Sequence, residues 1–185
     1  MTRTELKLAG YGGQGIITMS KLLAKGALLY EGKEVVQTEA YGAAARGGSC
    51  WAEVVISEEK INYPRAMDVD YLVVLTEESA ATFKKVVKSD GIIFKDPLTV
   101  ERLRPKKTQK LFDIPASRVA KEEFNLPVVA NVIMFGAIVA VTKLMTRENA
   151  KKTVETSVPK KALEINLKAL ERGFQIADEL LAKAQ

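Results

Sequence analysis

Residues 5–17 read ELKLAGYGGQGII, a short strand-like segment that breaks into glycines and then enters a helical pattern. Apolar residues alternate from Glu5 to Ala9, as they do in a strand. From Ile16 to Tyr30 the apolar side chains recur at helical spacing, and Lys33 to Thr38 is again strand-like. The stretch therefore predicts a strand–glycine turn–helix–strand unit of the usual βαβ length.

The rest of the chain continues this alternation of strands and helices. Further strands are expected at Cys50–Ser57, Asp70–Thr76, Gly91–Phe94 and Lys110–Asp113. Helices are expected at Glu77–Lys88 (stopped by residues 89–91), Ala116–Phe124, Val128–Met145, from Thr146 to before Pro159, and from Pro159 to about Lys183. We predict a single α/β domain over residues 1–185, a Rossmann-like three-layer sandwich with a mainly parallel sheet and a helical C-terminus.

The bulk composition excludes several classes of protein. The 28 basic and 23 acidic residues are interleaved, without the dense basic patch that a nucleic-acid partner requires. The most apolar stretch, Leu126–Val141, is shorter than the roughly 18 residues of a membrane span and contains Pro127 and Asn131. It is expected to be a buried helix. One cysteine and no secretion signal point to the cytoplasm.

The residues of catalysis are scarce in this chain. It has no histidine, which removes the commonest general base and metal ligand. Cys50, its single cysteine, forms no internal disulfide and holds no iron–sulfur cluster alone. We therefore assign no catalytic residue and no metal ligand, and we expect a chain that works with partners.

The glycine turn is the first candidate binding site. Glycines free the backbone to turn tightly, and the N–H groups at a helix start attract anions. The candidate ligand-binding residues here are Gly10, Gly12, Gly13, Gln14 and Gly15. The spacing is that of a dinucleotide fingerprint, with Glu39 near the place of a ribose-binding acid. Alternatively, the glycines only allow close packing of strand and helix.

An arginine loop is the second candidate. It is expected to leave the carboxyl end of the second strand beside the glycine turn, where open α/β sheets bind ligands. Its candidate residues are Arg46, Gly47, Gly48 and Ser49, since an arginine between small residues can present its donors to a carboxylate or phosphate. The alternative is an ion pair between Arg46 and Glu39 or Glu53.

Four other residues have simpler expected roles. Asn131 interrupts an apolar helix, and we expect it to bond a nearby loop backbone or, alternatively, to point at a ligand. Gly136 is expected to allow close helix packing. Tyr41 is expected to be a packing residue rather than a catalytic acid, and Cys50 a small buried residue.

The motifs taken together resemble one family over nearly the whole chain. The series comprises Gly10-Tyr-Gly-Gly-Gln-Gly-Ile-Ile, Glu39-Ala-Tyr-Gly-Ala-Ala-Ala-Arg-Gly-Gly-Ser, Ile114-Pro-Ala-Ser, Asn131-Val-Ile-Met-Phe-Gly-Ala and Lys161-x-x-Glu-x-Asn-x-x-Ala-Leu-x-x-Gly173. It resembles the γ subunit of 2-oxoacid:ferredoxin (flavodoxin) oxidoreductases. Val36-Gln-Thr-Glu-Ala-Tyr-Gly and Ile61-Asn-Tyr-Pro are most similar to the 2-oxoglutarate type.

The resemblance implies a division of labour among subunits. Such enzymes decarboxylate a 2-oxoacid on thiamine diphosphate, pass electrons through iron–sulfur clusters to ferredoxin and transfer the acyl group to coenzyme A. This chain lacks the thiamine-binding pattern and the cysteine clusters, so both cofactors are expected on partner α, β and ferredoxin-like δ subunits. The chain itself is expected to bind no cofactor alone. Its expected contribution is to assembly and to the active-site entrance, where the glycine turn and the arginine loop face the partner subunits and help bind the anionic part of coenzyme A or shape the substrate channel.

Two alternatives from other classes stay open on the sequence. One is a small NAD(P)-dependent oxidoreductase that uses the same glycine turn. The other is a regulatory module that senses nucleotides through a Rossmann-like fold.

Overall fold

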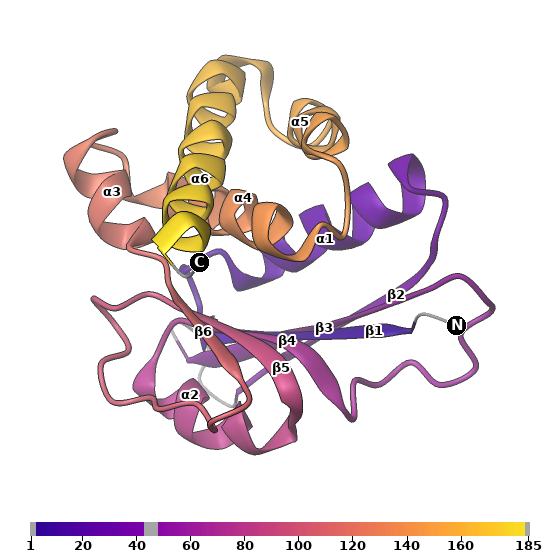
Figure 1. Cartoon of the computed structure of the whole chain (residues 1–185). Helices are drawn as coiled ribbons and strands as arrows, with labels where there is room; N and C mark the ends of the chain where they lie inside the picture. Colours follow the sequence, from indigo (N-terminus) through magenta and orange to yellow (C-terminus); the bar gives the residue numbers. More distant parts are fainter. Residues whose placement is uncertain (1–2, 43–47, 184–185) are drawn as a thin grey trace.

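Figure 1 shows a computed structural model of the chain, which describes residues 3–42 and 48–183. The strands are β1 (Thr4–Tyr11), β2 (Glu34–Tyr41), β3 (Ser49–Ser57), β4 (Val69–Val74), β5 (Val87–Lys95) and β6 (Lys110–Asp113). The helices are α1 (Ile16–Tyr30), α2 (Glu77–Phe83), α3 (Ala116–Glu122), α4 (Ala130–Thr142), α5 (Arg147–Glu155) and α6 (Leu163–Lys183). Short 3₁₀ turns are η1 (Lys84–Val86), η2 (Pro127–Val129) and η3 (Lys160–Ala162).

The strands form one six-stranded sheet in the order β2-β3-β1-β4-β5-β6. Strands β1, β4, β5 and β6 pair in parallel, whereas β3 is antiparallel to both β1 and β2. Strand β2 therefore runs in the same direction as β1, as a βαβ unit requires, but β3 is inserted between them. The prediction of a mainly parallel sheet is confirmed, with β3 as the reversed strand.

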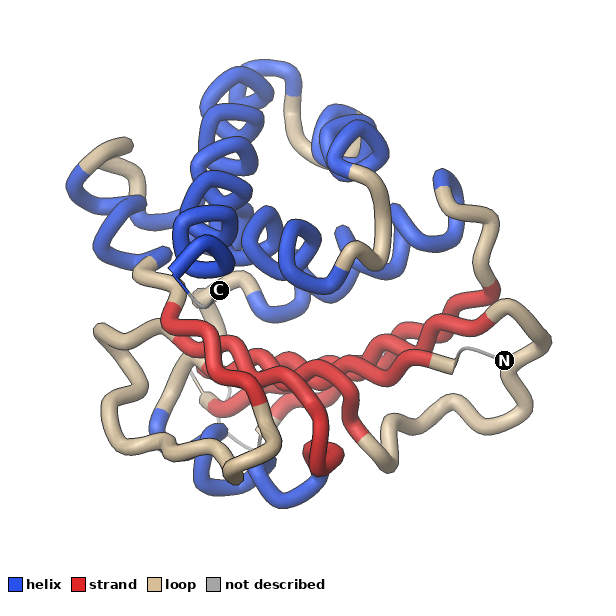
Figure 2. The backbone as a smooth tube through the Cα atoms, viewed as in Figure 1, coloured by secondary structure: helices blue, strands red, loops and turns tan. Residues whose placement is uncertain are grey.

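The two faces of the sheet are covered unequally. Helices α1, α3, α4, α5 and α6 lie on one face, and α2 lies on the other (Figures 1 and 2). The larger apolar core lies under the five helices, and a smaller cluster lies between the sheet and α2. The three-layer α/β arrangement is confirmed, with one thick helical layer and one thin one.

The helix predicted over Glu77–Lys88 is too long. Thr76 caps α2 by accepting from the Ser79 N–H at 3.1 Å, but α2 ends at Phe83 and η1 carries the chain to Val86. Strand β5 then begins at Val87, so residues 89–91 lie inside a strand and are not the stop of a helix. Val87 fits a helical pattern and a strand equally well, and its burial against Val69 in the smaller core decides for the strand.

A buried ion pair ties the loop after β3 to the face that α2 covers. Lys7 Nζ lies 2.7 Å from Glu53 Oε1, and Arg65 Nε donates to Glu53 Oε2 at 2.8 Å. Burial opposes ionisation of Glu53, but its bonds to Lys7, to the Ala66 N–H and to Arg65 outweigh burial, so the pKa of Glu53 lies below its usual range. Glu53 is thus a structural carboxylate of the sheet.

Helices α4 and α6 meet at the level of their backbones. A Cβ on Gly136 of α4 would lie 2.5 Å from the Leu170 carbonyl oxygen, and a Cβ on Gly173 of α6 would overlap the Ile133 carbonyl. The predicted packing role of Gly136 is confirmed, and Gly173 is its partner. The contact holds α4, whose first turn reaches the glycine turn, against the C-terminal helix.

We predict that Gly173→Ala destabilises the chain by about 2–3 kcal/mol, because the added methyl forces α4 and α6 apart. Urea denaturation followed by circular dichroism measures the loss. Gln175→Ala, an exposed change on the same helix, is the control and should stay within about 0.5 kcal/mol of wild type. Equal stability of the two variants would contradict the close contact.

Candidate functional site

The glycine turn lies between two neighbouring strands whose following helices cover opposite faces of the sheet. After β1 the chain continues into α1 on one face, and after the neighbouring strand β4 it continues into α2 on the other (Figure 1). The carboxyl ends of two such strands form the crevice in which open α/β sheets bind ligands. The sequence-predicted turn is therefore at the expected position of a site.

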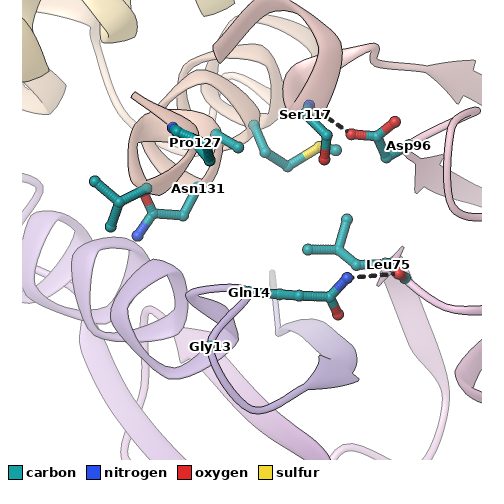
Figure 3. Close-up of a pocket in the computed structure, with 10 residues that line it drawn as sticks. Gly13, Gln14, Leu75, Asp96, Ser117, Pro127 and Asn131 are labelled. Atoms are coloured by element: carbon teal, nitrogen blue, oxygen red, sulfur yellow. Dashed lines mark hydrogen bonds between the residues drawn. The ribbon is translucent and has the colours of Figure 1, made fainter. Parts of the chain in front are cut away.

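Gln14 closes this crevice with its side-chain amide. Its Oε1 accepts from the Tyr11 N–H at 2.6 Å. Its Nε2 donates to the Leu75 carbonyl at 3.0 Å, the bond that Figure 3 shows as a dashed line. The Leu75 N–H in turn donates to the Ala9 carbonyl at 2.9 Å. Gln14 thus bridges the ends of β1 and β4, across the crevice in which a Rossmann fold binds its dinucleotide.

Most N–H groups within the turn are already bonded. Tyr11 N–H bonds to Gln14, Gly12 N–H donates to the Gly48 carbonyl at 2.9 Å, and Gln14 N–H donates to the Tyr11 carbonyl at 3.2 Å. At the start of α1, Ile16 and Ile17 have no N–H acceptor among residues 3–42 and 48–183. The donors that remain for a ligand among the described residues are those of Gly13, Gly15 and the start of α1.

The arginine loop and the glycine turn meet where the structure describes both. The Gly48 carbonyl accepts from Gly12, and Ser49 pairs with Tyr11 in the β1–β3 ladder. Arg46 and Gly47 lie outside the described residues. The two segments are therefore neighbours, as the sequence predicted.

Gly10 has a packing reason to be glycine. It lies in β1 opposite Cys50, and a Cβ there would be 2.5 Å from Gln14 Oε1. Gly10 thus makes room for the glutamine bridge. For this residue the packing alternative explains the glycine.

Two neighbouring clefts line the turn and share some of their lining residues. Cleft 1, of about 220 Å³, is lined by Gly13, Gln14, Leu75, Asp96, Ser117, Pro127, Val128, Ala130, Asn131 and Met134 (Figure 3). Cleft 2, of about 290 Å³, is lined by Tyr11, Gly12, Gly13, Gly15, Ile16, Ile17, Thr18, Tyr41, Cys50, Val128 and Asn131. Gly13, Val128 and Asn131 belong to both, and we call the two clefts together the groove.

Asn131 enters the groove from α4. It is 8% exposed, and its side chain makes no hydrogen bond with any residue that the structure describes. The prediction that it bonds a loop backbone is wrong, and the alternative of a ligand contact stays open. Gly15 makes its position possible, because a Cβ there would lie 2.5 Å from Asn131 Nδ2 and the φ of 76° suits glycine.

Asp96 gives cleft 1 a negative charge that the sequence analysis missed. It is 1% exposed and accepts from the Ser117 N–H at 2.7 Å and the Leu98 N–H at 3.0 Å. Its place directly after a buried strand and before Pro97 was the available signal. Among residues 3–42 and 48–183, the side chains that line cleft 2 include no charged one.

Exposed apolar side chains rim cleft 2. Tyr41 and Val128 are 64% and 66% exposed, and Tyr11 is 40% exposed. The expected packing role of Tyr41 within the chain is therefore wrong. Tyr11 donates its hydroxyl to Glu78 at 3.1 Å, and that bond, with the charge of Glu78, raises the pKa of Tyr11. Apolar rims of this kind mark interaction surfaces.

Cys50 is 4% exposed, so the prediction of a small buried residue is confirmed, and burial raises the pKa of its thiol.

Within residues 3–42 and 48–183, no group of three or more His, Cys, Asp and Glu side chains is arranged to hold a metal ion. In the same residues no helix combines the length and apolarity needed to cross a membrane.

Comparison with known proteins finds relatives along nearly the whole chain. Residues 5–176 match the family model described as pyruvate ferredoxin/flavodoxin oxidoreductase. The chain is 39% identical over 180 residues to 2-oxoglutarate synthase subunit KorC of Methanocaldococcus jannaschii, covering 96% of each chain.

Two solved structures are similar in fold. One is the gamma subunit of a keto/oxoacid ferredoxin oxidoreductase from Geobacter sulfurreducens, with a TM-score of 0.83, 33% identity, and coverage of 94% of this chain and 98% of that one. The other is 2-oxoglutarate:ferredoxin oxidoreductase from Magnetococcus marinus, with a TM-score of 0.85 and 22% identity. This chain corresponds to 32% of that longer chain, and 97% of this chain is covered.

We predict that Gln14→Leu destabilises the chain by about 1–2 kcal/mol, because the Tyr11 N–H and the Leu75 carbonyl lose their partner. Urea denaturation measures the loss. Thr18→Ala, an exposed change in the first turn of α1, serves as the control and should change stability by less than about 0.5 kcal/mol. A Gln14→Leu chain as stable as wild type would show that the bridge is dispensable.

Proposed function

This chain belongs to the pyruvate ferredoxin/flavodoxin oxidoreductase family, and we propose that it is the γ subunit of a 2-oxoglutarate:ferredoxin oxidoreductase. The resemblance that the motifs suggested is thereby confirmed at the level of the family. The proposed reaction of the complex converts 2-oxoglutarate and coenzyme A into succinyl-CoA and CO₂, with reduction of ferredoxin.

The observation that best supports this proposal is the match to a 2-oxoglutarate synthase subunit along nearly the whole chain. At 39% identity, the alignment with the Methanocaldococcus KorC leaves only 4% of either chain uncovered. A match of that extent favours the same role in the same kind of assembly. The proposed partners are α and β subunits, a ferredoxin-like δ subunit where it is separate, and ferredoxin as acceptor, all in the cytoplasm.

The side chains of this chain offer few groups for catalysis, which suits a subunit whose partners carry out the reaction. No histidine is present, and the lone cysteine is buried among apolar residues. We propose that thiamine diphosphate and the iron–sulfur clusters are held by the partner subunits. The γ chain would then contribute surface and binding groups rather than reacting atoms.

The groove is the part of the surface proposed to serve the active site. It carries free N–H donors at the start of α1 and an apolar rim of Tyr11, Tyr41 and Val128. In the proposed complex a partner subunit packs on this rim, and the groove with the Arg46 loop takes the anionic part of coenzyme A.

The alternative of a stand-alone NAD(P) enzyme is disfavoured by Gln14. Its amide spans the crevice between β1 and β4, across which a Rossmann fold binds its dinucleotide, and it consumes the Tyr11 N–H. The glycine spacing alone therefore does not make a dinucleotide site here. The same bridge disfavours a nucleotide-sensing module that binds in the Rossmann manner.

We predict that the partner subunits reduce ferredoxin with 2-oxoglutarate and coenzyme A only when this chain is present. Reconstitution from separately expressed subunits, followed by ferredoxin reduction, measures this. Pyruvate and 2-oxoisovalerate serve as competing substrates at equal concentration. Full activity without the chain, or a faster reaction with another 2-oxoacid, would refute the subunit role or its substrate, respectively.

We further predict that Arg46→Ala raises the KM for coenzyme A by about 10-fold, the loss expected for one hydrogen bond to a charged group. The assay uses the assembled enzyme at saturating 2-oxoglutarate, whose KM should not change. Lys107→Ala removes one positive charge from an exposed loop outside the groove and is the matched control. Unchanged affinity and turnover in Arg46→Ala would remove this role for the arginine.

A further inference from the structure

We propose that exposed basic residues beside α2 form a docking surface for an acidic segment of another protein, in which Asp or Glu residues flank an apolar side chain. The residues are Lys84, Lys85, Arg102 and Arg104, which we call the basic surface. Two of them line a third cleft, cleft 3, which shares no lining residue with the groove. The inference goes beyond the proposed function, because it concerns a surface separate from the candidate ligand site.

The interleaving of charges along the sequence conceals an uneven distribution. Residues 84–110 contain nine basic and three acidic residues, whereas the other 158 residues contain 19 basic and 20 acidic ones. This segment alone therefore accounts for the net charge of +5. Two of its lysines are paired, Lys88 with Asp70 at 2.6 Å and Lys95 with Asp113 at 3.5 Å. The excess of positive charge consequently lies with the exposed side chains.

Hydrogen bonds hold the loop between β5 and β6 beside α2 (Figure 1). Glu77 Oε1 accepts from the Glu101 N–H at 2.6 Å and from the Arg102 N–H at 2.8 Å, and these bonds lower the pKa of Glu77. At the far end of the loop, Gln109 Nε2 donates to the Lys88 carbonyl at 2.9 Å. The basic residues of the loop are thereby brought next to those that follow α2.

Cleft 3 combines an apolar floor with a basic rim. Its volume is about 290 Å³, and it is lined by Glu77, Ala80, Ala81, Lys84, Arg102 and Leu103. Ala80 and Leu103 are buried, whereas Lys84 and Arg102 are exposed. The hollow suits one apolar side chain of a partner, and the rim suits carboxylates on either side of it.

The cations of the rim are free to bind those carboxylates. Within the described part of the chain, the side chains of Lys84, Lys85 and Arg102 make no ion pair and no hydrogen bond. By contrast, Lys151 and Lys152 of α5 lie 3.1 Å and 2.8 Å from glutamate oxygens. Positive side chains without partners attract a surface of opposite charge and raise the rate of encounter with it.

A protein partner fits this surface better than a nucleic acid does. Proteins that bind single strands stack bases on aromatic side chains. Residues 84–110 contain one aromatic residue, Phe94, and it is 0% exposed. The apolar floor of cleft 3 also matches an apolar side chain and not a phosphate. These two features favour an acidic protein segment.

The test is carbodiimide cross-linking of the assembly purified from its own cells through a tag on this chain. A carbodiimide joins a lysine amine to a carboxylate in contact with it, and mass spectrometry identifies the joined residues. We expect links from Lys84 or Lys85 to Asp or Glu of another protein. The double variant Lys84→Arg, Lys85→Arg keeps both charges and should lose the links while the assembly persists. Wild-type chains without such links would overturn the docking surface.

Charge reversal measures the strength of the contact. Lys84→Glu combined with Arg102→Glu should weaken binding of the cross-linked partner by at least about 10-fold in isothermal titration calorimetry. Lys160→Glu combined with Lys161→Glu makes the same change of charge at exposed residues away from cleft 3 and should stay within about 2-fold of wild type. Equal weakening by both pairs would overturn the proposal, and if the first pair does not fold, the cross-links decide.

The remaining outcomes separate this inference from its competitors. If labelled single-stranded DNA binds the basic surface more tightly than the partner does, the surface is a nucleic-acid site and the proposal fails. If the complex reduces ferredoxin with 2-oxoglutarate but Lys84 and Lys85 form no links, the docking surface fails and the subunit role stands. If the links lead to a protein outside any thiamine-dependent complex, the docking surface stands and the subunit role fails.

Discussion

The close approach of α4 to the start of α1 is the constraint on which the candidate site depends. Asn131 reaches over Gly15 only because that residue has no side chain and adopts a φ of 76°. The position of α4 is itself fixed from the other side, where Gly136 and Gly173 bring α4 and α6 into backbone contact. Glycines at these two contacts thus fix the position of α4 between the C-terminal helix α6 and the turn after β1.

The Gln14 bridge limits what the glycine turn can bind. In a dinucleotide-binding fold, the dinucleotide lies across the crevice between two strands of the sheet. Here the Gln14 amide spans β1 and β4, which moves the remaining donors outward to the first turn of α1. These free donors therefore lie at the surface, beside the exposed Tyr41 and Val128, where we propose that a neighbouring subunit packs. That arrangement suits a chain that shares its ligand with a partner.

The sequence predicted the order of strands and helices because apolar spacing and glycines record local structure directly. It could not predict that β3 inserts between β1 and β2, since pairing depends on contacts between distant segments. The helix expected over Glu77–Lys88 was wrong because Val87 suits both periods, and only its burial against Val69 decides between them. In the site, the sequence predicted that the arginine loop lies beside the glycine turn, because each follows the carboxyl end of a strand, and the bond between Gly12 and Gly48 agrees with this. The missing partner of Asn131 and the buried Asp96 depend on three-dimensional packing, so no local pattern revealed them.

The central claim is that this chain works only inside a multisubunit oxidoreductase. Its most direct test is to isolate the tagged chain from its own cells under anaerobic conditions and determine the mass and cofactor content of what is recovered. The account predicts a complex in which larger subunits carry thiamine diphosphate and iron–sulfur clusters. Recovery of the chain alone, active on a substrate without those companions, would contradict it.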